Sequence, residues 1–112
     1  MENLDIEALA PKMEEAASLM AMLSHPVRLR ILCLMADREH HVQALADAAR
    51  LSQPAVSHHL KKLRDSGLVQ TRRDAQTIYY SLRGTEVGRV LETLQSIYCP
   101  EVVAAPVEQN RR

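Results

Sequence analysis

The feature that most constrains the fold is a change of hydrophobic periodicity midway along the chain. Between residues 52 and 66, Val56, Leu60 and Leu63 are spaced by four and three, which places them in one buried stripe on a helix. Gly67 is a residue that commonly ends a helix. The two stretches that follow, "LVQTRR" and "TIYYSL", read as strands joined by the polar "DAQ". A helix followed directly by a β-hairpin is therefore expected here.

Four further helices are expected around this unit, over residues 11–23, 26–36, 42–49 and 85–98. The helix over 42–49 is separated from the helix over 52–66 only by the short "RLS" turn. The order is then helix, helix, helix–turn–helix, hairpin, helix. This order predicts a mainly α fold with a β-hairpin wing, a winged helix-turn-helix of about five helices and two strands.

The length of 112 residues predicts a single domain. We expect a flexible N-terminus over residues 1–10, the domain over 11–100, and a flexible tail over 101–112. No apolar run approaches the roughly 18 residues of a membrane span, and the acidic N-terminus does not resemble a signal peptide. The expectation is a cytoplasmic protein with no membrane partner, in which two thiols stay reduced.

Charge is unevenly distributed although the formal net charge is zero. The first 25 residues contain five acidic residues and one lysine, whereas residues 52–83 contain six basic and two acidic residues. A basic segment on a neutral chain indicates a surface oriented toward an anionic partner. An ordinary solvated face is the alternative interpretation of the same charges.

The helix over 52–66 has the side chains of a DNA-recognition helix. Opposite its apolar stripe lie Gln53, Ser57, His58 and Lys61, which can read base edges, and small Ala55 admits close approach. The neighbouring basic side chains can bond phosphates, and those of the hairpin would form a wing near the DNA backbone or minor groove. The full predicted DNA-binding set, with the helix-capping serine included, is Ser52, Gln53, Ala55, Ser57, His58, Lys61, Lys62, Arg64, Arg72, Arg73 and Gln76.

Two other classes of protein are compatible with parts of this pattern. An interaction module that binds protein through the winged helix would show no salt-dependent DNA affinity. A small thiol enzyme, such as a persulfide carrier, is disfavoured because the chain has no Cys-x-x-Cys motif and no Gly-rich cofactor loop. We therefore expect no enzymatic activity and no cofactor.

The chain has two cysteines, Cys33 and Cys99. Cys33 lies in an apolar helix, where a cysteine is often a small buried filler. Arg30, one turn earlier, would lower the pKa of its thiol if the two side chains faced each other. Cys99 ends the last predicted helix, just before Pro100, where a side chain is expected to be partly accessible.

Three stretches, "LSHPVRLRILCLM", "LSQPAVSHHLKKLRDSGLV" and "RRDAQTIYYSL", resemble the ArsR-type winged-helix repressors. The resemblance covers about residues 13–100. It implies a homodimer whose interface is built from the helices over 11–23 and 85–98. It also implies that two recognition helices enter successive major grooves of an imperfect palindrome in double-stranded DNA.

The usual metal sites of that family are missing from this sequence. The region before the recognition helix, "HHVQALADAA", has no cysteine, and the last helix, "TEVGRVLETLQSIY", has neither His nor Asp. We therefore predict no metal ligands. Two alternatives stay open: a zinc site built from His40, His41 and a cysteine, and a thiophilic metal bound by the two thiols.

The stretches "RILCLM", "RRDAQTIYYSL" and "YCP" resemble a narrower branch of the family, the dithiol regulators of the SqrR, BigR and HlyU type. This resemblance implies that Cys33 and Cys99 are sensor thiols. Low-molecular-weight persulfides and polysulfides would link them by a disulfide or a longer sulfur bridge, and the repressor would then leave its operator. A direct disulfide requires Cα atoms about 4.4–6.8 Å apart, whereas a longer bridge spans a wider gap.

Overall fold

The computed structural model describes residues 4–103 and contains all five predicted helices and both predicted strands. Most boundaries lie within one or two residues of the predicted ones. The elements are α1 (Ile6–Leu9), the 3₁₀ turn η1 (Ala10–Lys12), α2 (Met13–Leu23), α3 (Pro26–Leu34), β1 (His40–His41), α4 (Val42–Ala49), α5 (Gln53–Asp65), β2 (Val69–Asp74), β3 (Thr77–Leu82), α6 (Glu86–Tyr98) and α7 (Pro100–Val103).

Short helical segments lie at both ends of the described chain. Of residues 1–10, the structure folds Ile6–Leu9 into a helical turn whose first amides donate to the side chain of Asp5. Of residues 101–112, the first three belong to the short helix α7, and residues 104–112 lie outside the described part of the chain. Local capping explains the N-terminal turn, which the sparse apolar pattern of that segment did not indicate.

One apolar core holds the helices and the hairpin together. Its most buried side chains come from α3, α4, α5, β2 and α6, and the predicted stripe of α5 is fully inside it. Three residues of α5, spaced by four and three, are buried on one side of the helix. This fixes the rotation of α5 about its own axis, with its polar face outward. The buried side chains include Ile31, Leu32, Leu45, Val56, Leu60, Leu63, Val69 and Val87.

Side chains cap the starts of α3, α4 and α5. The Nδ1 atom of His25 accepts from the Val27 amide at the start of α3, and that of His41 accepts from the Ala44 amide at the start of α4. The hydroxyl of Ser52 accepts from the Ala55 amide and caps α5. Gly67, with φ of +80°, ends the helical segment, as predicted.

The wing belongs to a three-stranded antiparallel sheet of order β1-β3-β2. Arg72 of β2 and His41 of β1 are both direct partners of Tyr79 on β3. The strand β1 was not expected, and both of its histidines are half-buried rather than exposed loop residues. A two-residue strand has no periodicity of its own, so its pairing with β3 is decided by the tertiary fold.

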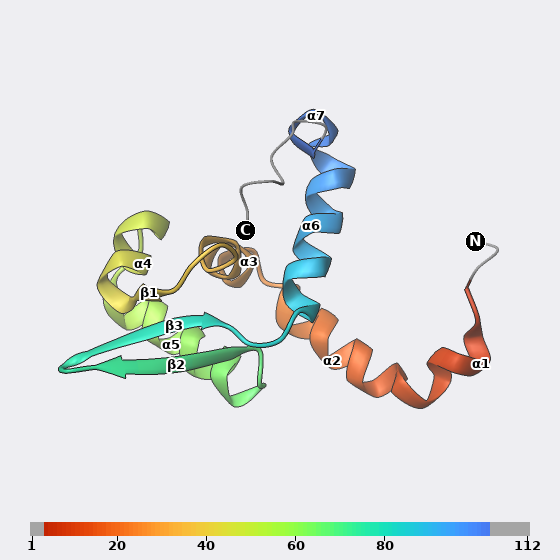
Figure 1. Ribbon diagram of the computed structural model, residues 1–112, viewed down its shortest axis with the longest axis horizontal. Helices are drawn as coiled ribbons and strands as arrows, with labels where there is room; N and C mark the ends of the chain where they lie inside the picture. Colours follow the sequence, from red (N-terminus) through yellow and green to blue (C-terminus); the bar gives the residue numbers. More distant parts are fainter. Residues whose placement is uncertain (1–3, 104–112) are drawn as a thin grey trace.

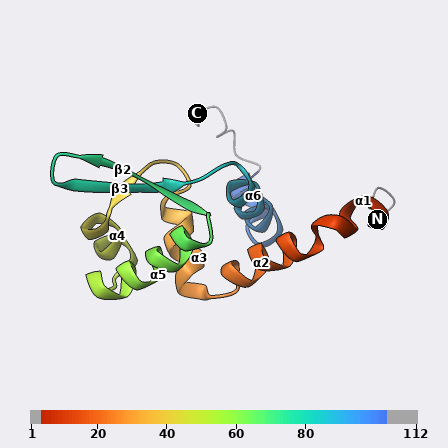
Figure 2. The same ribbon diagram turned by 90° about the horizontal axis from the view of Figure 1, so that it is seen from below.

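The molecule is elongated, with principal extents of 50, 34 and 24 Å. Two views agree that α1 and α2 form an arm extending away from α4, α5 and the hairpin (Figures 1 and 2). On α6, Val87 and Leu91 are buried in the core, whereas Ile97 is 60% exposed in the single chain. Leu94 still packs against the core, and the far end of α6 projects away from α4, α5 and the hairpin (Figure 1).

Among the described residues, none of the helices is by itself long and apolar enough to cross a membrane. Only the combination of Ile6–Leu23 with Pro26–Leu34, which meet at a bend of 93°, reaches the necessary length and composition.

Candidate nucleic-acid interface and cysteine pair

The polar face of α5 lies on the outside of the molecule. Gln53, Ser57, His58 and Lys61 are all exposed, and the small Ala55 between them is half-buried. The helix runs along the lower edge of the view in Figure 2, with no element covering it there. The structure therefore presents, on one accessible face, the side chains that the sequence assigned to base recognition.

Gln53 does not project freely, because α4 holds its amide. Its Nε2 donates to Oε1 of Gln43, and the Nε2 of Gln43 donates in turn to Oδ1 of Asp47 at 2.7 Å. A carboxylate only accepts, so Asp47 fixes the orientation of Gln43, which then fixes that of Gln53. Sequence reasoning missed Gln43, although the spacing of four between Gln43 and Asp47 on a predicted helix was a signal for it.

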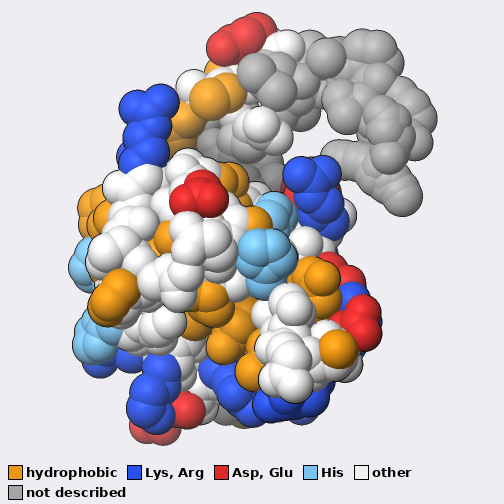
Figure 3. Space-filling view, turned by 90° about the vertical axis from the view of Figure 1, so that its left-hand side faces the viewer, with side chains coloured by type: hydrophobic (Ala, Val, Ile, Leu, Met, Phe, Trp, Pro, Cys, Tyr) orange, Lys and Arg blue, Asp and Glu red, His pale blue; other side chains and the backbone are white. Residues whose placement is uncertain are grey.

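Basic side chains flank this face. Lys61, Lys62 and Arg64 are exposed, and Lys61 also forms a surface ion pair with Asp65 at 3.0 Å. Lys and Arg side chains gather along the lower edge of the face in Figure 3, and histidine side chains also reach the surface there. Because the lysine's ion pair is solvent-exposed, a phosphate can replace the carboxylate at little cost.

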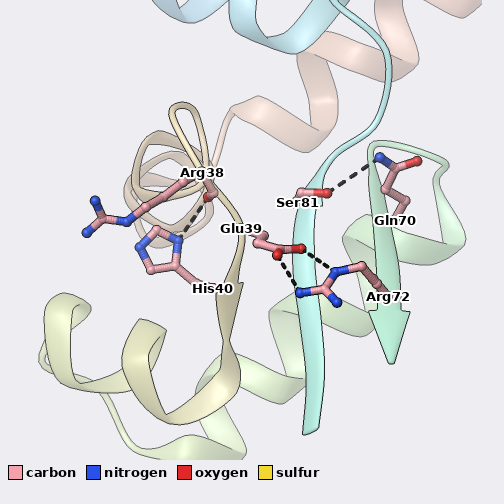
Figure 4. A network of polar contacts seen from close by, with 6 residues as sticks. All are labelled: Arg38, Glu39, His40, Gln70, Arg72 and Ser81. Atoms are coloured by element: carbon pink, nitrogen blue, oxygen red, sulfur yellow. Dashed lines mark hydrogen bonds and ion pairs between the residues drawn. The ribbon is translucent and has the colours of Figure 1, made fainter. Parts of the chain in front are cut away.

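The two wing arginines have different surroundings. The guanidinium of Arg72 forms a bidentate ion pair with Glu39, at 3.0 Å from Nε to Oε1 and 2.6 Å from Nη2 to Oε2 (Figure 4). Arg73 donates only to the carbonyl of Ala75 in the turn, at 3.3 Å. Gln76 is exposed in the same turn. Arg73 and Gln76 are therefore available at the tip, whereas Arg72 is engaged with a carboxylate.

Three histidines meet where α3 begins beside α5. The His25 and His59 rings lie 4.9 Å apart, and the His58 and His59 rings 5.5 Å apart. The Nδ1 atom of His59 is buried and has no hydrogen-bond partner. Burial lowers the pKa of His59, and the nearby His25, His58, Arg28 and Lys62 lower it further. His25 also caps α3 through its Nδ1 atom.

The two cysteines are free thiols on different elements. Cys33 lies on the exposed side of α3, next to the buried Ile31 and Leu32. Cys99 is half-buried at the C-terminal cap of α6, and its amide donates to the carbonyl of Gln95 at 2.7 Å. Cys99 thus follows the part of α6 that leaves the core.

The expected effect of Arg30 on Cys33 is wrong. The guanidinium of Arg30 donates to the carbonyl of Ala49 at the end of α4, at 3.3 Å. Neighbouring side chains partly desolvate the sulfur of Cys33, and this burial raises the pKa of its thiol above the ordinary value. The arginine instead connects the cysteine-bearing helix to the first helix of the helix-turn-helix.

No group of three or more His, Cys, Asp or Glu side chains that could hold a metal gathers within the described residues. In particular, His40 and His41 use their Nδ1 atoms locally, against the Arg38 carbonyl and the Ala44 amide.

Comparison with known proteins identifies the family to which this chain belongs. The profile of bacterial regulatory proteins of the arsR family matches residues 25–71, which run from the cap of α3 into β2. The transcriptional activator HlyU of Vibrio cholerae is 38% identical over 96 residues, a region that covers 86% of this chain and 89% of HlyU. The chain belongs to the ArsR family. Its winged helix-turn-helix is therefore a DNA-binding domain, and members of this family are transcription regulators rather than enzymes.

Solved structures of similar regulators agree with this fold. The transcriptional repressor BigR from Xylella fastidiosa has a TM-score of 0.81 at 34% identity, covering 86% of this chain and 98% of BigR. The homodimeric winged helix-turn-helix DNA-binding domain from Mycobacterium bovis has a TM-score of 0.73 at 27% identity, covering 95% of this chain and 97% of that one. The predicted fold class is confirmed.

Proposed function

We propose that this ArsR-family regulator is a homodimeric repressor that senses reactive sulfur species through Cys33 and Cys99 and then releases its operator. The observation that carries the proposal is the placement of the thiols. One is on α3, which packs in the core beneath the DNA-binding unit, and the other ends α6, which leaves that core.

The DNA-contacting surface of this repressor comprises the exposed face of α5 and the tip of the wing. Gln53, Ser57 and His58 would read bases, with Ala55 admitting close approach. Lys61, Lys62, Arg64 and Arg73 would bond phosphates, and Gln76 would approach the backbone or minor groove. The hydroxyl hydrogen of Ser52 can still reach a phosphate, because its oxygen accepts the capping bond.

Dimerisation is supported by the apolar side chains that the single chain leaves uncovered. Met13 and Met20 of α2, and Ile97 and Tyr98 of α6, are all exposed. They lie on the two helices expected to form the interface, and the similar M. bovis domain is homodimeric. Covering this surface with a second copy would remove apolar area from water and set the distance between two recognition helices.

The sensing chemistry needs only the two thiols and the effector. One cysteine thiolate attacks the outer sulfur of a low-molecular-weight persulfide, takes that sulfur, and releases the small thiolate. The second cysteine thiolate then attacks the protein-bound inner sulfur and displaces hydrosulfide. The two cysteines are oxidised to a disulfide, while the transferred sulfane sulfur is reduced to sulfide. If both cysteines first become persulfides, the same displacement leaves one additional sulfur in the bridge.

A bridge would alter DNA binding through α3. It would tie the end of α6 to a helix that packs against the core and contacts α4 through Arg30. Two recognition helices must match a half-site spacing of roughly 34 Å, so a small shift at each α3 is enough to reduce affinity.

Fluorescence anisotropy tests this proposal, using a labelled duplex selected from random sequence by the reduced protein. Reduced protein is compared with samples treated with glutathione persulfide, glutathione disulfide, peroxide or zinc, each checked by intact mass. We expect release by persulfide, with a mass that shows a Cys33–Cys99 bridge. The variants Cys33→Ser and Cys99→Ser should bind the duplex and keep it under persulfide. Full release of Cys99→Ser, or release of the wild type by zinc alone, would contradict the dithiol mechanism.

A further inference from the structure

The base of the wing is anchored by Val69, Tyr80 and Leu82, which pack in or against the core, and its backbone pairing to the rest of the molecule is short. Its strand β3 pairs with only two residues of the body, His40 and His41 in β1, and β2 is the outer strand. Such a short ladder restrains a hairpin weakly, so the direction of the wing depends on side chains. The wing's tip nevertheless has to stay in register with α5 if both are to contact one duplex.

One side-chain cluster crosses all three strands of this sheet. Glu39 immediately precedes β1, and Arg72 is on β2, so their ion pair spans the intervening strand β3 (Figure 4). Neighbouring strands are about 4.8 Å apart, so two long side chains are needed to close that distance. The Arg72 guanidinium lies over the ring of Tyr79 on β3, 4.7 Å from its centroid. The Tyr79 ring in turn meets the ring of His41 at 6.0 Å.

The positive charge of Arg72 and the negative charge of Glu39 stabilise each other. The hydrogen bond from Arg72 lowers the pKa of Glu39, and the same bond raises the pKa of Arg72. Arg72 therefore already has a bidentate carboxylate partner, and a DNA phosphate would have to displace it. Arg73 is the next residue on β2 and points to the opposite face of the strand, without a carboxylate partner in the described structure.

We propose that Arg72 is a positioning residue and not a phosphate contact. Through Glu39 and Tyr79 it holds the wing to the segment that joins α3 to α4, and so sets the direction of Arg73 and Gln76. This replaces the backbone contact that the sequence indicated for Arg72. It also connects the wing to the segment that follows the cysteine-bearing helix. The inference rests on the proposed DNA interface, of which the wing is a part.

The dependence of affinity on salt separates positioning from phosphate contact. Anisotropy with the selected duplex over a series of salt concentrations gives the slope of log Kd against log salt. This slope falls by about 0.9 for each DNA phosphate that a variant no longer neutralises. We expect Arg72→Gln and the isosteric Glu39→Gln each to weaken binding about three- to fivefold with the slope unchanged. The matched control, Arg73→Gln, should lower the slope by about 0.9.

A double-mutant cycle and a charge exchange complete the test. Glu39→Gln should add little to Arg72→Gln, because either change breaks the same pair. The exchanged variant, with Glu39→Arg and Arg72→Glu together, should bind the duplex more tightly than Arg72→Glu alone. The inference is overturned if Arg72→Gln lowers the slope, or if the exchange weakens binding below Arg72→Glu. If the wild type shows no salt-dependent DNA binding, the proposed function fails instead.

Discussion

Individual side chains in this regulator are controlled by neighbours that are distant in sequence. Arg30 would act on Cys33 if only spacing mattered, yet it bonds the end of α4. Arg72 would contact DNA if only charge mattered, yet it bonds Glu39. In both cases a long arginine side chain donates to an acceptor that lies on a different segment of the chain, the Ala49 carbonyl for Arg30 and the Glu39 carboxylate for Arg72. What each of these side chains can bind therefore depends on its neighbours in the folded protein, not on sequence spacing alone.

The thiol of Cys33 tests this dependence on surroundings, because partial burial raises its pKa. In the Cys99→Ser variant, the rate of alkylation by iodoacetamide follows the fraction of Cys33 thiolate. That rate should stay low near neutral pH and reach its midpoint above the pH found for a cysteine in an unfolded peptide. The same protein in denaturant is the control, and its midpoint should shift down. A native midpoint at or below the denatured one would contradict the desolvated environment.

The lowered pKa of His59 predicts that the folded protein loses stability in acid. Its pKa is lower in the folded protein than the ordinary 6.5. The unfolded chain therefore takes up the proton first, and stability falls as the pH drops below about 6.5 toward the folded-state pKa. Urea unfolding at several pH values should show this fall in wild type and a smaller one in His59→Gln. The variant His40→Gln, outside the cluster, should keep the wild-type dependence. Equal slopes in wild type and His59→Gln would rule out this role for His59.

Helices α4 and α5 show how an element combines a structural and a functional face. The inner stripe of α5 fixes its rotation, its serine cap fixes its start, and Gly67 fixes its end. The outer face of α4 then orients Gln53 through Gln43 and Asp47. In the proposed DNA interface, base recognition by Gln53 would therefore depend on α4 as well.

The Ser52 cap of α5 can be tested against a second serine, Ser57, on the same helix. Ser52→Ala removes the acceptor for the Ala55 amide and should lower the free energy of unfolding by about 1 kcal/mol. Ser57→Ala changes an exposed serine on the same helix and should change it by less than about 0.5 kcal/mol. Urea denaturation followed by circular dichroism measures both. Equal effects of the two substitutions would show that the cap is not what stabilises this helix start.

The whole molecule has two ends with different roles. The arm formed by α1 and α2 and the end of α6 project away from α5 and the wing (Figure 1). Apolar side chains on these projecting parts are exposed, among them Met20 and Ile97. Elongation and exposed apolar residues away from the DNA-binding face fit a subunit that is completed by a second copy. In such an arrangement, Cys99 lies at the part of α6 that dimerisation would affect.

Dimerisation predicts the behaviour of charge substitutions on this surface. Met20→Glu and Ile97→Glu place a carboxylate on uncovered apolar positions and should shift the protein to monomer in sedimentation velocity. DNA affinity should then fall by roughly a hundredfold, because two half-sites are no longer bound together. Ala48→Glu, on exposed α4, should remain dimeric. A dimeric Met20→Glu, Ile97→Glu double variant would place the interface elsewhere.

Local sequence patterns were enough to predict the order of the five main helices and the hairpin, the buried stripe of α5 and its outward polar side chains. These follow from local periodicity, caps and Gly67, which act within a few residues. The strand β1, the Glu39–Arg72 pair and the Gln43–Gln53 contact were decided only by the tertiary structure. Each joins residues ten or more apart, and no local pattern specifies such a partner. The raised pKa of the exposed Cys33 thiol belongs to the same group, because its partial desolvation depends on what the tertiary fold packs around it.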